Sequence, residues 1–283
     1  MRKRLAFFLG LVPALTVAAG PSPFSVDFFQ NKLWRDGRAE VSVYEAEENR
    51  EGMLRKAEVR HIVVREPFSP ISMVKTDHWQ MRGTYDVFKL NQILHIPVGT
   101  FEYNQMHSSF WRVDSGKCIK FSLASIDSCG NTYKEGRVRG RQLNYSAHTY
   151  WEGMDEIKGR IPLSATALFY DELPLKLRSL NWKEATAFSA GVIPTIIGSR
   201  SDVLRAIPTD FTIEHQPNAK TWQVRLTTDS GKDVFDFEDS YPYGLRDWKR
   251  ADGSSLHLKS SVRIPYWKLN QPGDEKYLSE PYP

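Results

Sequence analysis

Apolar and polar residues alternate along most of this chain, a period of two that is typical of β-strands. The alternation is clearest within residues 110–141, where Ile119, Phe121 and Leu123 are interleaved with polar or small residues. A second run of the same kind follows the corner Cys129-Gly130-Asn131. Two such runs around a Gly-Asn corner predict an antiparallel pair of strands.

The same alternation predicts strands through the rest of the chain. They are expected at residues 38–47, 54–66, 87–96, 100–113, 185–197, 210–215, 222–226, 234–237, 245–251 and 254–264. Asp252-Gly253 between the last two is a strong hairpin signal. Residues 71–84 show no period and predict a loop.

The period becomes helical only at residues 164–181. Ser164 suits a helix N-cap, and Pro174 is tolerated at the first turn of a second helix. We therefore expect one broken helix, with five apolar residues buried against the sheet: Leu168, Phe169, Leu175, Leu177 and Leu180. The predicted fold class is mainly β (α+β): a large curved antiparallel sheet or half-barrel with this helix packed on it. If the helix is a lid, Pro174 should be its hinge.

The first residues have the pattern of a targeting segment. Arg2, Lys3 and Arg4 precede a short apolar run that ends in small residues, which predicts a signal peptide at residues 1–19. The remaining residues 20–283 are then expected to form a single β-rich domain, exported to the periplasm or the cell exterior. No later stretch is apolar enough to predict a transmembrane segment.

Charge excludes one class of partner. Loss of the leader removes three positive charges from a formal net charge of +4 and leaves +1. A nearly neutral chain is not expected to bind nucleic acid.

Two cysteines in an exported chain raise the question of a disulfide. A continuous strand over residues 118–126 would extend roughly 27 Å, at about 3.3 Å per residue. Residues 126–129 can return only about 10 Å, whereas a disulfide needs Cα atoms within about 7 Å. We therefore expect Cys118 and Cys129 to be unpaired, unless the strand breaks early.

Several short motifs resemble a family of uncharacterised exported bacterial proteins, often labelled septum formation inhibitor Maf. The motifs are Trp34-Arg35-Asp36-Gly37, Glu66-Pro67-Phe68-Ser69, Lys89-Leu90-Asn91, Gly99-Thr100-Phe101, Ser128-Cys129-Gly130, Asp171-Glu172-Leu173-Pro174 and Pro265-Tyr266-Trp267. Maf nucleotide pyrophosphatases carry a Ser-Pro-Arg-Arg-type motif near the N-terminus, and this sequence has none. The resemblance thus implies an exported protein of unknown role, with one family cysteine at Cys129. By fold-level analogy, the architecture is also similar to that of periplasmic lipoprotein carriers.

Candidate catalytic groups are few. Cys129 could be a nucleophile if a base such as His107 lay within hydrogen-bond reach, but a small residue at a turn is the alternative. The seven histidines show no metal-ligand spacing, and His61 is expected to be a surface position. We expect no metal and no cofactor, and the absence of a catalytic signature favours a protein that is not an enzyme.

A basic stripe is the best candidate for ligand binding. Arg137, Arg139 and Arg141 fall on one face of the predicted second strand, and Tyr150 and Trp151 could add a stacking platform. The alternative is a solvated outer face. Our leading hypothesis is a non-catalytic cell-envelope protein that binds a lipid-like amphiphile or a glycan in the concavity of the sheet. The alternatives are a cysteine-dependent hydrolase or transferase using Cys129, and a structural partner in an envelope complex.

Overall fold

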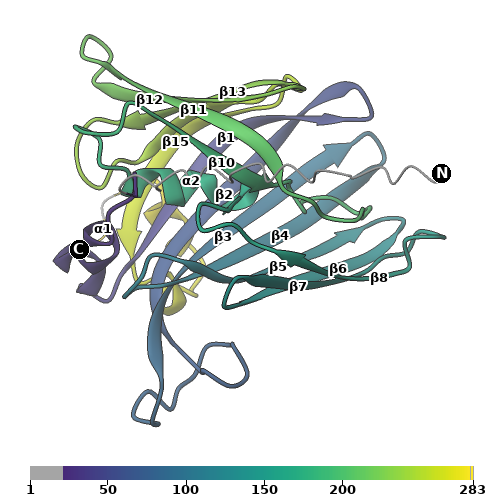
Figure 1. The fold of residues 1–283 in the computed structure, drawn as a ribbon, viewed down its shortest axis with the longest axis horizontal. Helices are drawn as coiled ribbons and strands as arrows, with labels where there is room; N and C mark the ends of the chain where they lie inside the picture. The colour runs from purple at the N-terminus through teal and green to yellow at the C-terminus, as the bar shows by residue number, and fades with distance from the viewer. Residues whose placement is uncertain (1–21, 281, 283) are drawn as a thin grey trace, which may run out of the picture.

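The structure, a computed structural model, describes residues 22–280 and 282, so the predicted leader lies outside the described residues. One continuous sheet of 15 strands forms the body of the molecule (Figure 1). The first eight strands are β1 (Ala39–Arg50), β2 (Met53–Phe68), β3 (Tyr85–Val98), β4 (Phe101–Arg112), β5 (Cys118–Asp127), β6 (Gly130–Arg139), β7 (Gln142–His148) and β8 (Glu156–Pro162). The others are β9 (Leu168–Phe169), β10 (Ala187–Ile193), β11 (Ile207–Gln216), β12 (Thr221–Thr228), β13 (Gly231–Glu238), β14 (Leu245–Lys249) and β15 (Ser255–Ile264).

The sheet is a meander with two halves, β1–β8 and β9–β15, which join where β1 pairs with β15. Strands β1 to β8 follow one another outward on one side, and β15 back to β9 on the other. All neighbours are antiparallel except the short pair β9–β10. Both hairpins expected from the sequence form, one turning at Ser128-Cys129 and the other at Asp252-Gly253. The predicted fold class, a mainly β protein with a large curved sheet, is confirmed.

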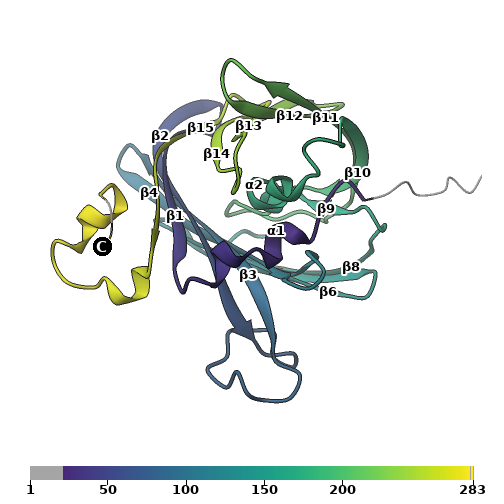
Figure 2. The same ribbon diagram turned by 90° about the vertical axis from the view of Figure 1, so that its left-hand side faces the viewer.

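Short helical turns lie inside the curve of the sheet (Figure 2). They are η2 (Tyr170–Glu172), α2 (Leu173–Lys176) and η3 (Leu177–Ser179), and we call residues 168–180 the plug. The predicted helical start at Ser164 is wrong. Leu168 and Phe169 instead pair with β10, and the Glu172 side chain accepts a hydrogen bond from the Phe169 backbone at 3.1 Å.

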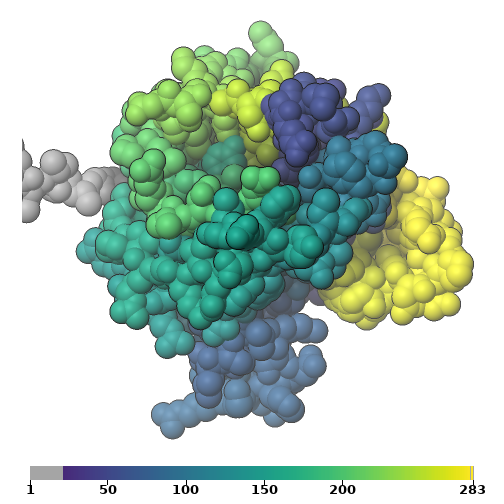
Figure 3. Space-filling model, turned by 90° about the vertical axis from the view of Figure 1, so that its right-hand side faces the viewer, coloured from purple at the N-terminus to yellow at the C-terminus, as the bar shows by residue number. Residues whose placement is uncertain are grey.

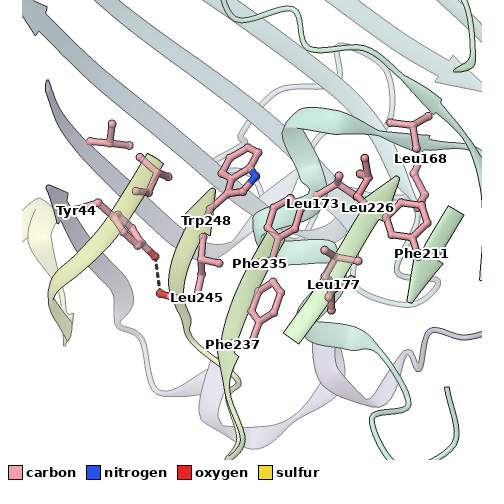
Figure 4. Packing of buried hydrophobic residues seen from close by; sticks show 14 of the residues in the cluster. Tyr44, Leu168, Leu173, Leu177, Phe211, Leu226, Phe235, Phe237, Leu245 and Trp248 are labelled. Atoms are coloured by element: carbon pink, nitrogen blue, oxygen red, sulfur yellow. Dashed lines mark hydrogen bonds between the residues drawn. The ribbon is translucent and has the colours of Figure 1, made fainter. Parts of the chain in front are cut away.

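The burial expected for the plug is confirmed. All five apolar residues singled out from the sequence are at most 8% exposed. Their cluster draws on both halves of the sheet, with Tyr44 and Ile96 from the first half and Phe211 and Phe235 from the second. Figure 4 shows the second half, where Leu168, Leu173 and Leu177 lie beside Phe211, Phe235 and Trp248. Pro174, the expected hinge of a lid, is itself buried. The plug therefore fills the concavity as part of the hydrophobic core.

Two segments lie outside the curve. The C-terminal residues 266–280 cover part of the convex face, where Tyr266, Tyr277 and Leu278 pack against a cluster around Val41 and Ile62 (Figure 2). They include η4 (Tyr266–Lys268) and η5 (Asp274–Leu278). The loop predicted at residues 71–84 is confirmed; in the structure it spans residues 69–84 and projects from the body between β2 and β3 (Figure 1). At the N-terminus, α1 (Asp27–Gln30) and η1 (Lys32–Arg35) precede β1.

Candidate functional site

Two adjoining pockets lie at the end of the sheet where β1 begins and β15 ends, and we call them the open-end pockets. The first has a volume of about 490 Å³ and lies between β1, β15, η1 and the loop after β13. Its walls are polar and charged as well as apolar: Glu40, Ser42, Glu238, Ser261 and Arg263 line it together with Leu245 and Leu258. Ser42 and Ser261 share a hydrogen bond of 2.9 Å between their hydroxyls.

The second open-end pocket, of about 340 Å³, shares Asn31 and Tyr241 with the first. Three aromatic rings belong to its wall, and the ring of Tyr243 contacts the other two. Trp182 and Tyr243 have ring centroids 5.4 Å apart, and Tyr243 and Tyr241 have centroids 5.8 Å apart. Polar groups stand around these rings, from Asp27, Asn181, Lys183 and Glu184. Flat rings beside hydrogen-bonding groups suit a ligand with both apolar faces and hydroxyls.

A buried ion pair connects the two pockets. Arg178 of the plug donates to both carboxylate oxygens of Glu40 on β1, at 2.6 and 2.9 Å. Burial opposes the charged form of Arg178, but the adjacent Glu40 carboxylate outweighs it, so the pKa of the guanidinium is raised. The Arg178 Nε also donates to the Pro242 carbonyl at 2.8 Å and so fixes the loop that separates the pockets.

Tyr241 is fixed in the same loop. Its hydroxyl donates to the Phe28 carbonyl of α1 at 3.2 Å. Burial raises the pKa of Tyr241 to about 12, so the phenol stays protonated and can donate at neutral pH. The aromatic wall of the second pocket is therefore held from two sides, by the plug and by α1.

A cluster of buried polar side chains lies deeper, between the plug and the sheet. His61, Gln92 and His107 occupy one row across β2, β3 and β4, and all three are buried. The Gln92 amide donates to the Asp171 carbonyl of the plug at 2.7 Å and lies 3.1 Å from Nδ1 of His107. Because an amide nitrogen can only donate, Nδ1 accepts, and the proton of the neutral ring lies on Nε2, 3.8 Å from Asp171 Oδ2.

The expectation that His61 is a surface position is wrong, because β2 turns this residue toward the plug. Burial, reinforced by the positive charge of Arg178, lowers the pKa of His61 to about 3. Burial also lowers the pKa of His107, although Asp171 acts in the opposite direction. Burial raises the pKa of Glu172, which accepts a hydrogen bond from the Trp111 indole at 2.7 Å. Both histidines are therefore held neutral under the plug.

These shifts predict acid sensitivity. Above the ordinary histidine pKa of 6.5, His61 is neutral in both folded and unfolded chains; below it, only the unfolded chain takes up the proton. Stability is therefore expected to fall between pH 6.5 and about 3, by up to about 1.4 kcal/mol per pH unit for this residue. Glu172, with its pKa shifted in the opposite direction, offsets part of the loss.

The replacement His61→Phe should make the pH dependence of the unfolding free energy flatter between pH 6 and pH 4. The ring packs on Tyr44, with centroids 4.7 Å apart, and its Nε2 has no hydrogen-bond partner among the described residues, so phenylalanine can replace it. Denaturant unfolding at each pH measures the slope, with exposed His148→Phe as the control. Equal slopes for both variants and the unmodified chain would contradict the assignment.

The structure does not bring Cys129 and His107 together. Cys129 is exposed at the β5–β6 turn, whereas His107 is buried opposite Leu123, six residues back along the hairpin. At about 3.3 Å per strand residue, this spacing leaves the thiol well beyond hydrogen-bond reach of the imidazole. Cys118 is half-buried and also free, which confirms the expectation that the cysteines are unpaired.

The basic stripe is located on β6 and the turn that follows it. Arg137 and Arg139 share the outer face of β6, and the Arg137 Nε lies 2.5 Å from Glu135, which also pairs with Lys120. Arg141 is not on the strand face as expected: it belongs to the β6–β7 turn, where its Nε donates to the Leu163 carbonyl. Tyr150 lies against Gly130, and Trp151 packs under Arg200. None of the five lines an open-end pocket.

The described residues do not meet the requirements of a metal site or of a membrane-spanning helix. Among those residues, no three His, Cys, Asp or Glu side chains are grouped so that they could hold a metal ion. Within the same range, no helix combines the length and the apolarity needed to cross a bilayer.

The fold and its pockets define a class: a mainly β protein built on one open, curved sheet with a filled concavity. Among solved structures, the chain is similar to a β-barrel-like protein of domain of unknown function DUF1849 from Brucella abortus. The two share 9% sequence identity with a TM-score of 0.47, over 80% of this chain and 98% of that one. No family model and no curated protein matches the chain. The resemblance to exported proteins labelled Maf therefore stays a prediction.

Proposed function

We propose that this chain is a non-catalytic binding protein of the cell envelope that takes an oligosaccharide in the open-end pockets. The observation that supports this most directly is the wall of three aromatic rings at Trp182, Tyr241 and Tyr243, surrounded by amide, carboxylate and ammonium groups. The location in the envelope follows from the predicted leader at residues 1–19.

The wall suits a sugar because each sugar ring offers an apolar face as well as hydroxyls. The partly exposed rings of Tyr241 and Tyr243 present apolar surface, and the buried ring of Trp182 packs behind Tyr243. Tyrosine combines such a surface with a polar edge. Asp27, Asn31 and Asn181 add acceptors and donors within the same pocket. Together the two pockets enclose a volume within the range of small-ligand sites, roughly 300–1,000 Å³.

An amphiphile is less well supported as a ligand in the concavity. The plug places Leu173, Leu175 and Leu177 where an acyl chain would lie, and all three are at most 1% exposed. An acyl chain would have to displace side chains whose burial is worth about 1.5–3 kcal/mol each. The open-end pockets, in contrast, require no such displacement.

Calorimetric titration tests the proposal. The full chain is titrated with soluble muropeptides and with N-acetylglucosamine oligomers, two probes that represent envelope glycans. We expect measurable binding of at least one probe, and about a tenfold loss of affinity in Tyr243→Ala, equivalent to about 1.4 kcal/mol. Tyr150→Ala, a tyrosine exposed at the far edge of the sheet, is the matched control and should bind as the unmodified chain does.

Two outcomes would contradict the proposal. Loss of binding in Tyr150→Ala but not in Tyr243→Ala would place the ligand on the stripe of Arg137, Arg139 and Arg141. Absence of glycan binding, together with uptake of a fluorescent fatty acid by delipidated protein, would favour the amphiphile.

A further inference from the structure

The loop between β2 and β3 carries several exposed apolar side chains. Residues 69–84 project away from the body as a separate lobe, drawn in blue at the bottom of Figure 3. Four large apolar side chains on it face solvent, with Ile71 81% and Trp79 66% exposed, beside Val74 and Met81. Long loops without secondary structure in compact domains are usually functional or disordered.

The base of this loop is fixed, so its apolar tip does not fold back onto the sheet. Lys75 forms a β-bridge with Phe68, and the Ser69 amide donates to the Val74 carbonyl at 2.9 Å. Met73 is buried against Phe68, and the Lys120 ammonium donates to its carbonyl at 3.0 Å. The loop is thus ordered by polar contacts while Ile71 and Trp79 remain outside, an arrangement that presents them to a partner at little entropic cost.

We propose that this loop docks the protein on the surface of an anionic lipid bilayer. Lys75 lies 3.7 Å from the carboxylate of Asp77, and Arg82 adds one further cation, so residues 69–84 carry a formal net charge of +1 that complements anionic headgroups. Tryptophan is favoured at membrane–water interfaces, and a few apolar side chains with flanking cations are enough for interfacial binding.

A protein partner fits these observations less well. A stable protein interface buries about 800 Å² on each partner, whereas the loop offers a narrow lobe with four apolar side chains. The lipids of a bilayer can rearrange around such a lobe, so binding does not require a surface of complementary shape. The docking proposal does not depend on the oligosaccharide site, which lies elsewhere on the molecule.

A fluorophore placed in the loop gives a site-specific test. An environment-sensitive dye is attached to Gln80→Cys of the full chain in a background of Cys118→Ser and Cys129→Ser, because both cysteines are free. Val203→Cys, at another exposed apolar residue, is the matched position. Vesicles of phosphatidylcholine with 30% phosphatidylglycerol should shift the emission of the dye at position 80 to the blue, and 0.5 M salt should reduce the shift. The dye at position 203 should report no change.

Loop variants then test which side chains carry the binding. In vesicle co-sedimentation, Ile71→Ser combined with Trp79→Ser should weaken binding about tenfold or more relative to Ile126→Ser, which changes another exposed residue. Any contribution of the N-terminal segment is the same in all variants, so the comparison isolates the loop. An unshifted dye at position 80, equal binding by both variants, or a blue shift that appears without vesicles as protein concentration rises would overturn the proposal, the last in favour of self-association.

Discussion

Replacing Leu177 with aspartate is expected to unfold the domain. Leu177 is fully buried in the plug, in a cluster with Trp182 just after the plug and with Phe211 and Phe237 from the second half of the sheet. The change removes a buried side chain worth about 1.5–3 kcal/mol and adds a carboxylate with no partner, which costs several kcal/mol more. Because domains are stable by only about 5–15 kcal/mol in total, the sum should exceed most of the available stability.

Circular dichroism during heating measures this effect, with Val203→Asp as the control at a position 75% exposed. The control should change stability by no more than about 0.5 kcal/mol. If the plug were instead a lid hinged at Pro174, Leu177→Asp would leave the melting temperature of the sheet unchanged and open residues 168–180 to proteolysis. That result would contradict the packing described here.

The strands could be predicted because a sheet with one buried face requires an apolar residue at every second position of each strand. Along β12, for example, Val224 and Leu226 are buried while Arg225 between them faces solvent. The hairpins were predictable for a similar reason, since Asp252-Gly253 supplies the backbone geometry of a tight turn. Local sequence therefore determined most element positions.

The position and the burial of the plug could be predicted, but its secondary structure could not. The apolar spacing of Leu168, Leu173 and Leu177 indicates a buried segment, but it does not reveal that Leu168 and Phe169 pair with β10. That pairing depends on residues about 24 positions away, which local periodicity cannot detect. As a result, within the predicted helix of residues 164–181 only the stretch from Tyr170 to Ser179 is helical.

The burial of the polar residues under the plug was indicated by the alternation in the sequence, but this indication was missed. His61 has the same parity along β2 as Val59 and Val63, both buried, so the alternation itself places it inward. The open-end pockets had no such signal. They combine β1, β15, α1 and the loop around Tyr241, which come together only through the pairing of the first and last long strands.

Replacing Arg178 with methionine is the second change with a large expected effect. Arg178 is buried and fully engaged, with two hydrogen bonds to Glu40 and a third to the Pro242 carbonyl. Methionine fills much of the same volume but leaves the Glu40 carboxylate buried without its cation. Breaking such a pair from one side costs about 3–5 kcal/mol, which corresponds to a fall in melting temperature of roughly 10 °C for a domain of this size.

The double variant Glu40→Leu with Arg178→Met separates the charge from the packing. If the loss in Arg178→Met comes from an uncompensated carboxylate, removing that carboxylate should restore most of the stability, because buried ion pairs are often replaced by apolar residues at little cost. Glu40→Leu alone should also be destabilising, since it isolates the guanidinium. Denaturant unfolding of the four proteins gives the coupling energy between the two sites. Single changes that simply add in the double variant would show that the ion pair does not hold the plug on β1.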